Sequence, residues 1–145
     1  NIELHIGGNI DRIDEKEGVL NIIDYKTGKE EEKNATIEKI FTHDGKTMNY
    51  ILQSMLYSIA AVDCGISGDA IPSLMYIHKK ETANYKDFIV KIDKKPISSI
   101  NEYRDEFMQN LKSIINEIFN VNTPFSPTDD QDRCSLCPYK QICGR

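Results

Sequence analysis

The chain has 145 residues, 39% of them hydrophobic, and a formal net charge of −5 at pH 7. This length suits one compact domain. No apolar stretch approaches the roughly 18 residues that span a membrane, so we expect a cytoplasmic protein. The acidic balance argues against a protein that coats nucleic acid by charge alone, although clustered lysines allow a local basic face. The start at Asn1, inside an apolar pattern and without methionine, predicts a piece of a longer protein.

The first predicted elements are two strands that form an antiparallel hairpin. Residues 2–14 alternate between apolar and polar side chains, with a bend at Gly7-Gly8. Residues 19–27 are rich in β-branched and aromatic side chains, and a polar turn joins them to the first strand. Residues 28–46 are largely charged, which predicts a long exposed excursion with one helical turn.

Two helices and two further strands follow in the order helix, strand, strand, helix. Their predicted ranges are 47–64, 70–79, 86–93 and about 99–120. Both helices have apolar residues at helical spacing, and Thr47 and either Ser98 or Ser99 are candidate N-caps. A loop rich in proline and aspartate then leads to a cysteine-bearing end. This order predicts an α/β or α+β domain with a mixed sheet flanked by helices.

The second predicted strand carries Asp24 and Lys26 two residues apart. Successive side chains of a strand point to opposite faces, so these two share one face. A two-residue turn within residues 15–18 puts Asp11 directly opposite Asp24, whereas a loop of all four residues makes it the diagonal neighbour. Both registers keep Asp11 on the same face, so we expect the three side chains to form one patch.

Two carboxylates this close repel each other unless a cation or a proton lies between them, and a hard divalent ion with oxygen ligands is the usual resident. Mg²⁺ suits Asp11 and Asp24, because it binds through one or two carboxylates together with substrate phosphate. Lys26 could then orient an attacking water or neutralise charge in the transition state. Taken alone, an Asp-x-Lys tripeptide is more often an ion pair at the end of a strand.

Three motifs occur together in the chain: GGNIDRID at 7–14, IIDYKTGK at 22–29 and QSMLY at 53–57. In this order and spacing they resemble the RecB/AddB-type nuclease domains of the PD-(D/E)XK superfamily. The resemblance implies a restriction-endonuclease-like fold and an exonuclease-like deoxyribonuclease that depends on Mg²⁺ or Mn²⁺. The family also carries an acidic or histidine residue on a helix that precedes the hairpin.

The resemblance also implies roles for residues of this chain. The implied catalytic residues are Asp11, Asp24, Lys26, Gln53 and Tyr57. The two aspartates would hold the metal ion, with the backbone carbonyl of Tyr25 as a further ligand. Spaced i, i+4 on one helix face, Gln53 and Tyr57 would line the same site. Without the hairpin motifs, the pair would be read as part of an ordinary helix whose tyrosine packs in the core.

Cys134, Cys137 and Cys143 form a C-x₂-C-x₅-C run near the end of the chain. Three clustered thiolates select Zn²⁺ or an iron–sulfur cluster, and disulfides are less expected in an intracellular protein. Iron–sulfur nucleases of the RecB/AddB-like and CRISPR-associated RecB-like groups carry this arrangement. The resemblance therefore implies a [4Fe-4S] cluster whose fourth ligand lies upstream. Cys64 lies outside the run and is read as a small buried residue.

The predicted organisation is a nuclease core over residues 1–121 and a cysteine-bearing tail over residues 122–145 that packs on it. The predicted function is DNA cleavage within a helicase–nuclease for recombination and double-strand-break repair, with a helicase domain or subunit as partner. Two other classes remain open. One is a DNA-binding or scaffolding module that keeps the fold but does not cut, and the other is a zinc-binding interaction domain.

Overall fold

A computed structural model of the chain describes residues 3–28, 34–42, 46–78, 88–128 and 130–144. The chain divides into two compact units, Asn1–Ile114 and Ile115–Arg145. The first unit combines a mixed sheet with helices, which confirms the predicted fold class.

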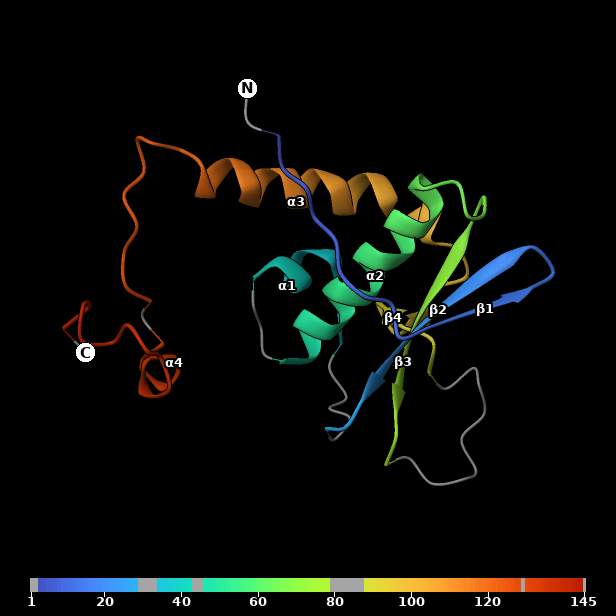
Figure 1. Cartoon of the computed structure of the whole chain (residues 1–145), viewed down its shortest axis with the longest axis horizontal. Coiled ribbons are helices and arrows are strands. Elements are labelled where there is room, and N and C mark those ends of the chain that lie inside the picture. Colours follow the sequence, from blue (N-terminus) through green and yellow to red (C-terminus); the bar gives the residue numbers. More distant parts are fainter. Residues whose placement is uncertain (1–2, 29–33, 43–45, 79–87, 129, 145) are drawn as a thin grey trace. The chain divides into compact units, whose positions relative to one another are not determined.

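The sheet of the first unit has the strand order β1–β2–β3 (Figure 1). Strands β1 (Arg12–Lys16) and β2 (Val19–Lys26) are antiparallel, whereas β3 (Ala70–Tyr76) is parallel to β2. The chain between β2 and β3 includes helices, as a parallel pair requires a long crossover connection. On its other edge β3 forms an antiparallel bridge, between Ser73 and Ile89.

A two-residue turn, Glu17-Gly18, closes the hairpin of β1 and β2. Both residues have positive φ angles, 55° and 79°, as a type I′ turn requires. The register pairs Arg12 with Ile23. The tighter of the two predicted turns is therefore the one found, since the right-handed twist of two strands favours this turn type.

The strand predicted over residues 2–14 forms only from Arg12 onward. Extended toward the N-terminus, the ladder would reach the last residue of β2, Lys26, at Asn9. Earlier residues have no partner on β2 to complete their hydrogen bonds. Residues 3–8 lie beyond that point, whereas Asn9 and Ile10 would still face β2 but do not pair with it. Residues 3–10 lack regular structure, and this part of the prediction is wrong.

Helix α2 (Lys46–Asp63) packs against β2 and β3, and α1 (Ile37–Phe41) packs against α2 (Figure 1). Helix α2 confirms the predicted helix but begins before Thr47, so this residue is not its N-cap. None of the helices in the described ranges is long and apolar enough to cross a membrane.

Helix α1 lies in the stretch predicted as an exposed excursion. Thr36 caps it, because its hydroxyl accepts a hydrogen bond from the backbone N–H of Lys39. The predicted helical turn is therefore found, but its predicted exposure is wrong, because three of its apolar side chains join the core. Residues 29–33 and 43–45 lie outside the described ranges. The buried side chains of α1 are Ile37, Ile40 and Phe41.

The strand predicted over residues 86–93 does not form as one element. The chain reverses at Asp93-Lys94, where both φ angles are positive, 51° and 65°. As a result β4 (Lys91–Ile92) pairs with β5 (Lys95–Pro96) in a short hairpin of its own. Residues 86–87 lie outside the described ranges.

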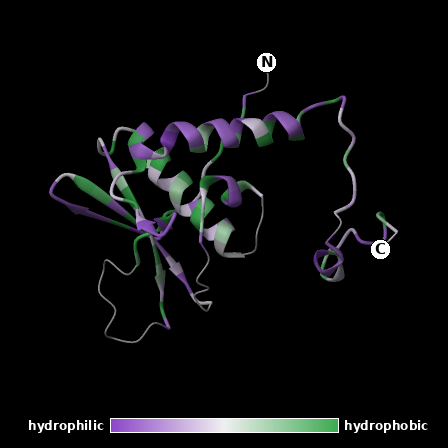
Figure 2. Cartoon of the chain, turned by 180° about the vertical axis from the view of Figure 1, so that it is seen from behind, coloured by the Kyte–Doolittle hydropathy of each residue, from purple (hydrophilic) through white to green (hydrophobic). Residues whose placement is uncertain are grey.

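The long helix predicted near the end of the first unit begins as a 3-10 turn, η2 (Ile100–Glu102), capped by Ser99. It continues as α3 (Arg104–Ile118), in which hydrophilic and hydrophobic residues alternate in bands (Figure 2). Its buried Phe107 meets Phe41 edge to face, with ring centroids 5.0 Å apart. This contact joins α3 to the core that α1 and α2 cover.

The second unit contains the short helix α4 (Gln131–Ser135). Asp130 caps it, because its carboxylate accepts a hydrogen bond from the backbone N–H of Asp132 at 3.1 Å. This helix begins inside the stretch 120–133 that the sequence predicts as loop, so the loop prediction is wrong for residues 131–133.

Candidate active site

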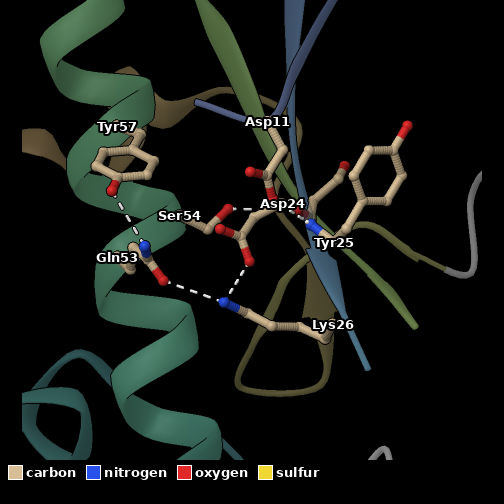
Figure 3. A network of polar contacts seen from close by, with 8 residues as sticks. Asp11, Asp24, Tyr25, Lys26, Gln53, Ser54 and Tyr57 are labelled. Atoms are coloured by element: carbon tan, nitrogen blue, oxygen red, sulfur yellow. Dashed lines mark hydrogen bonds and ion pairs between the residues drawn. The ribbon is translucent and has the colours of Figure 1, made fainter. Parts of the chain in front are cut away.

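Asp11 directly precedes β1, whose first residue, Arg12, pairs with Ile23, the residue before Asp24. The Oδ2 atom of Asp11 accepts a hydrogen bond from the backbone N–H of Tyr25 at 2.9 Å. This bond satisfies a backbone donor of β2 at a position that lies beyond the first residue of β1, Arg12. Figure 3 draws both aspartates on the side of β2 that faces α2.

Asp24 and Lys26 form an ion pair between Oδ2 and Nζ, with side chains that are only 6% and 12% exposed. The Oδ2 atom of Asp24 is buried, and no group of the described residues gives it a hydrogen bond of good geometry. A buried carboxylate oxygen is costly unless a charge or a donor compensates it. The Lys26 ammonium is the positive charge that faces it, and the oxygen retains capacity for a further cation.

A chain of hydrogen bonds leads from Lys26 along one face of α2. Lys26 Nζ donates to Gln53 Oε1 at 3.1 Å, and Gln53 Nε2 donates to Tyr57 Oη at 3.0 Å (Figure 3). An ammonium can only donate, so the amide oxygen of Gln53 must face it. Tyr57 is 9% exposed and belongs to the hydrophobic core. Its ring packs in the core while its hydroxyl ends the network, and its role in an active site stays a prediction.

Two residues on the same face of α2 were not identified from the sequence. The ring of Tyr50 lies 4.1 Å from Lys26 Nζ, measured to the ring centroid. Ser54 is fully buried, and its hydroxyl donates to the backbone carbonyl of Ser73 in β3 at 3.5 Å. The spacing of Tyr50, Gln53 and Tyr57, i, i+3, i+7, is the signal that could have found the first of them.

Gly8 packs directly against Tyr57. A Cβ atom at Gly8 would lie 2.2 Å from Tyr57 Oη and 2.8 Å from two ring carbons, whereas a Cβ at Gly7 would meet nothing within 4 Å. The sequence predicts a bend at these two glycines. The structure shows in addition that the second glycine allows the chain to pass over the tyrosine of the network.

Arg12, which lies in the GGNIDRID motif, does not reach this site. Its guanidinium makes a two-point contact with Asp14, with both nitrogen–oxygen distances at 2.8 Å. Hydrogen bonds to Asp14 and then to Tyr25 raise the pKa of Arg12 above its ordinary value. Arg12 and Asp14 lie on the hairpin face opposite to Asp11, because the side chains of a strand alternate.

The donor set fits a divalent ion with oxygen ligands. The carbonyl of Lys26 accepts a hydrogen bond from the N–H of Ile77, on the β3 side of β2. Because backbone groups alternate along a strand, the carbonyl of Tyr25 points to the other edge, where Asp11 lies. Asp24, Asp11 and this carbonyl would hold Mg²⁺ or Mn²⁺, with water or substrate at the remaining positions.

The cysteine tail does not gather into a metal site. Cys134, Cys137 and Cys143 are free, and Cys134 lies in α4. Within the described ranges no three side chains from His, Cys, Asp and Glu come together to hold a metal ion. Cys64, predicted to be buried, is exposed just beyond the end of α2.

A family model described as the PD-(D/E)XK nuclease superfamily matches residues 1–144. Comparison with curated proteins gives no match, and comparison with solved structures gives none either. The family match spans the hairpin, the α2 network and the cysteine run.

Proposed function

The chain belongs to the PD-(D/E)XK nuclease superfamily, and we propose that it is a deoxyribonuclease domain that hydrolyses phosphodiester bonds with Mg²⁺ or Mn²⁺. The observation that carries the proposal is the meeting of two acids and one amine beside α2. Asp24 and Lys26 come from β2, and Asp11 comes from the segment before β1. This is a donor set that a divalent ion and a phosphate can share.

In this proposal Asp11, Asp24 and the Tyr25 carbonyl hold the ion, which supplies Lewis acidity and an activated water when bound. The Lys26 ammonium has three N–H donors, two of which face Asp24 and Gln53. The third can donate to the attacking water or to a phosphate oxygen. Lys26 thereby orients the nucleophile and offsets the negative charge that develops on the phosphate.

Gln53 and Tyr57 act through Lys26 in this proposal. The amide oxygen of Gln53 receives one N–H of the ammonium, and Tyr57 fixes the amide by accepting from its nitrogen. A lysine stem has four rotatable carbons, so an unheld ammonium would sample many positions. The two α2 residues restrict it to the side of β2 where the acids lie.

The test is a cleavage assay with linear and circular DNA in Mg²⁺ or Mn²⁺. We expect cleavage by the wild type and a loss of at least about 100-fold in Asp24→Asn and Lys26→Met. Asp14→Asn is the matched control, since it removes an equal charge from the other face of the hairpin. Equal cleavage by Asp24→Asn and wild type would refute the proposal. DNA binding without cleavage by any of these proteins would instead support the non-cleaving module.

The choice of linear and circular substrates also separates the modes of cleavage. We propose exonuclease-like action, which requires a free end, so linear DNA should be shortened while a covalently closed circle stays intact. Cleavage of the circle at the same rate would assign endonuclease action. The resemblance of the hairpin motifs to RecB/AddB-type domains supports this part of the proposal, as it supports a helicase partner in recombination and double-strand-break repair.

We also propose that the tail, residues 122–145, packs on the core and that Cys134, Cys137 and Cys143 bind a metal centre in the full-length protein. Their C-x₂-C-x₅-C spacing supports this, with a [4Fe-4S] cluster as the expected centre. The test is the iron, sulfide and zinc content of protein purified without oxygen. Stoichiometric zinc without iron would favour the interaction domain, and absence of both would reject a metal centre.

A further inference from the structure

The ammonium of Lys26 has a third neighbour besides Asp24 and Gln53. The ring of Tyr50 lies with its centroid 4.1 Å from Nζ, within the roughly 6 Å over which a cation is attracted to an aromatic face. The side chain of Lys26 is 12% exposed, so water screens this attraction only in part. The contact thus has the distance and the burial at which a cation–π interaction is strong.

Tyr50 holds Lys26 in a way that differs from its other two neighbours. Asp24 is the charged partner of Lys26 and, in the proposed function, also a ligand of the metal ion. Its carboxylate would then be shared, and the ion pair with Lys26 would weaken. The ring of Tyr50 is not a ligand of the metal ion. Its contact with the ammonium therefore does not compete with metal binding.

The position of Tyr50 follows from the packing of α2. Tyr50 lies one helical turn before Gln53, and both reach the same ammonium from one face of the helix. Gln53 alone fixes the ammonium along one hydrogen bond. The ring adds a second, differently directed restraint on a flexible side chain.

We propose that Tyr50 is a positioning residue whose ring face keeps the Lys26 ammonium beside Asp24 in readiness for the attacking water. This inference rests on the proposed function of Lys26 and adds to it a residue that acts only through another. The chemistry requires an aromatic face and does not require the phenol. Phenylalanine should therefore replace Tyr50, and leucine, which offers similar apolar bulk without a ring face, should not.

The first measurement is independent of cleavage. In the full chain without metal at one fixed pH, NMR of lysine side chains should show the Lys26 signals displaced by the ring current of Tyr50, with assignment by their absence in Lys26→Arg. The displacement should persist in Tyr50→Phe and vanish in Tyr50→Leu. Tyr139→Leu, at an exposed tyrosine of the second unit, should leave it unchanged. Lys26 signals that are the same in wild type and Tyr50→Leu would overturn the proposed contact.

The second measurement is steady-state cleavage by the same proteins. Tyr50→Leu should lower kcat about tenfold with an unchanged KM, because the ammonium is misplaced while DNA still binds. Tyr50→Phe should stay within about threefold of wild type. A wild-type kcat in Tyr50→Leu, or an equal loss in both variants, would overturn the positioning role. Thermal unfolding identifies a folding defect, and Tyr50→Met then takes the place of Tyr50→Leu.

The two measurements separate failure of this inference from failure of the proposed function. If the wild type does not cleave DNA, the proposed function is wrong, and the proposed role of Tyr50 in positioning Lys26 for cleavage is wrong as well. The NMR displacement then reports the ring contact alone. If the wild type cleaves and Tyr50→Leu matches it, only the inference about Tyr50 is wrong.

Discussion

The backbone N–H of Tyr25 donates a hydrogen bond to the Oδ2 atom of Asp11 at 2.9 Å. The acceptor is a side chain at the place where the ladder of the hairpin would otherwise continue through the backbone. Asp11 therefore ties the segment that enters β1 to the end of β2. A carboxylate has about four lone-pair sites, so this single bond leaves capacity for a metal ion.

Substitution of Asp11 should separate its structural role from its proposed metal-binding role. Asp11→Asn keeps an oxygen that can accept from Tyr25, so the free energy of unfolding should stay within about 1 kcal/mol of wild type. Asp11→Ala loses the acceptor and should cost about 1–2 kcal/mol. Both variants should bind Mn²⁺ at least about tenfold more weakly, because the charge is gone. Urea denaturation and calorimetric titration measure the two effects, and full Mn²⁺ affinity in Asp11→Asn would argue against Asp11 as a ligand.

The buried ion pair of Asp24 and Lys26 should be strongly coupled. Asp24→Ala leaves the ammonium without its counter-charge and should destabilise the metal-free protein by about 3 kcal/mol. The double variant Asp24→Ala/Lys26→Met removes both charges and should recover much of that loss. A double-mutant cycle by urea denaturation, completed with Lys26→Met, gives the coupling energy. Additive effects of the two substitutions would mean that the pair contributes no coupling.

Gly8 offers a test of the contact with Tyr57, and its neighbour provides the control. Gly8→Ala places a Cβ against the buried ring, so Tyr57 or the entering segment must shift, at a cost of about 1–3 kcal/mol. The shift should also weaken the bond from Gln53 to Tyr57 and reduce cleavage. Gly7→Ala meets nothing within 4 Å and should change stability by less than about 0.5 kcal/mol. Equal melting temperatures for the two variants would contradict the close packing.

The stability of the fold should fall at alkaline pH partly through Tyr103. Burial raises the pKa of its phenol, and the carboxylates of Glu102, Asp93 and Glu106 raise it further. The folded chain therefore holds this proton more tightly than the unfolded chain. The resulting stabilisation is complete below about pH 10, the ordinary tyrosine pKa, and is lost as pH rises through the folded pKa. Urea denaturation between about pH 8 and 11 should show a steeper loss in wild type than in Tyr103→Phe, whereas parallel curves would exclude this contribution.

The local periodicities of the chain were sufficient to predict part of the geometry of the candidate site. Side chains of a strand alternate with a period of two, so Asp24 and Lys26 had to share one face wherever β2 was placed. In the same way a helix brings residues four apart together, and Gln53 and Tyr57 are bonded to each other. These relationships depend on backbone geometry within one element, which the order of residues specifies directly.

Relationships between elements depended on the tertiary structure. Two hairpin registers were compatible with the sequence, and the turn at Glu17-Gly18 selects the one that pairs Arg12 with Ile23. β1 begins only at Arg12, next to the position where the side chain of Asp11 accepts the N–H of Tyr25, and the burial of α1 follows from its packing against α2. Each of these outcomes depends on a partner far along the chain, which local patterns do not specify.

The contacts of the Lys26 ammonium show which relationships the sequence determined and which ones the tertiary structure decided. The sequence by itself determined that an acid and an amine share one strand face and that an amide and a phenol share one helix face. Only the packing of α2 on β2 decided that Gln53 and Tyr50 both reach Lys26, and only the path of the entering segment decided that Gly8 covers Tyr57. The reason is physical: periodicity within an element is set by backbone dihedral angles, whereas the contacts of one element with another are set by how their buried surfaces fit.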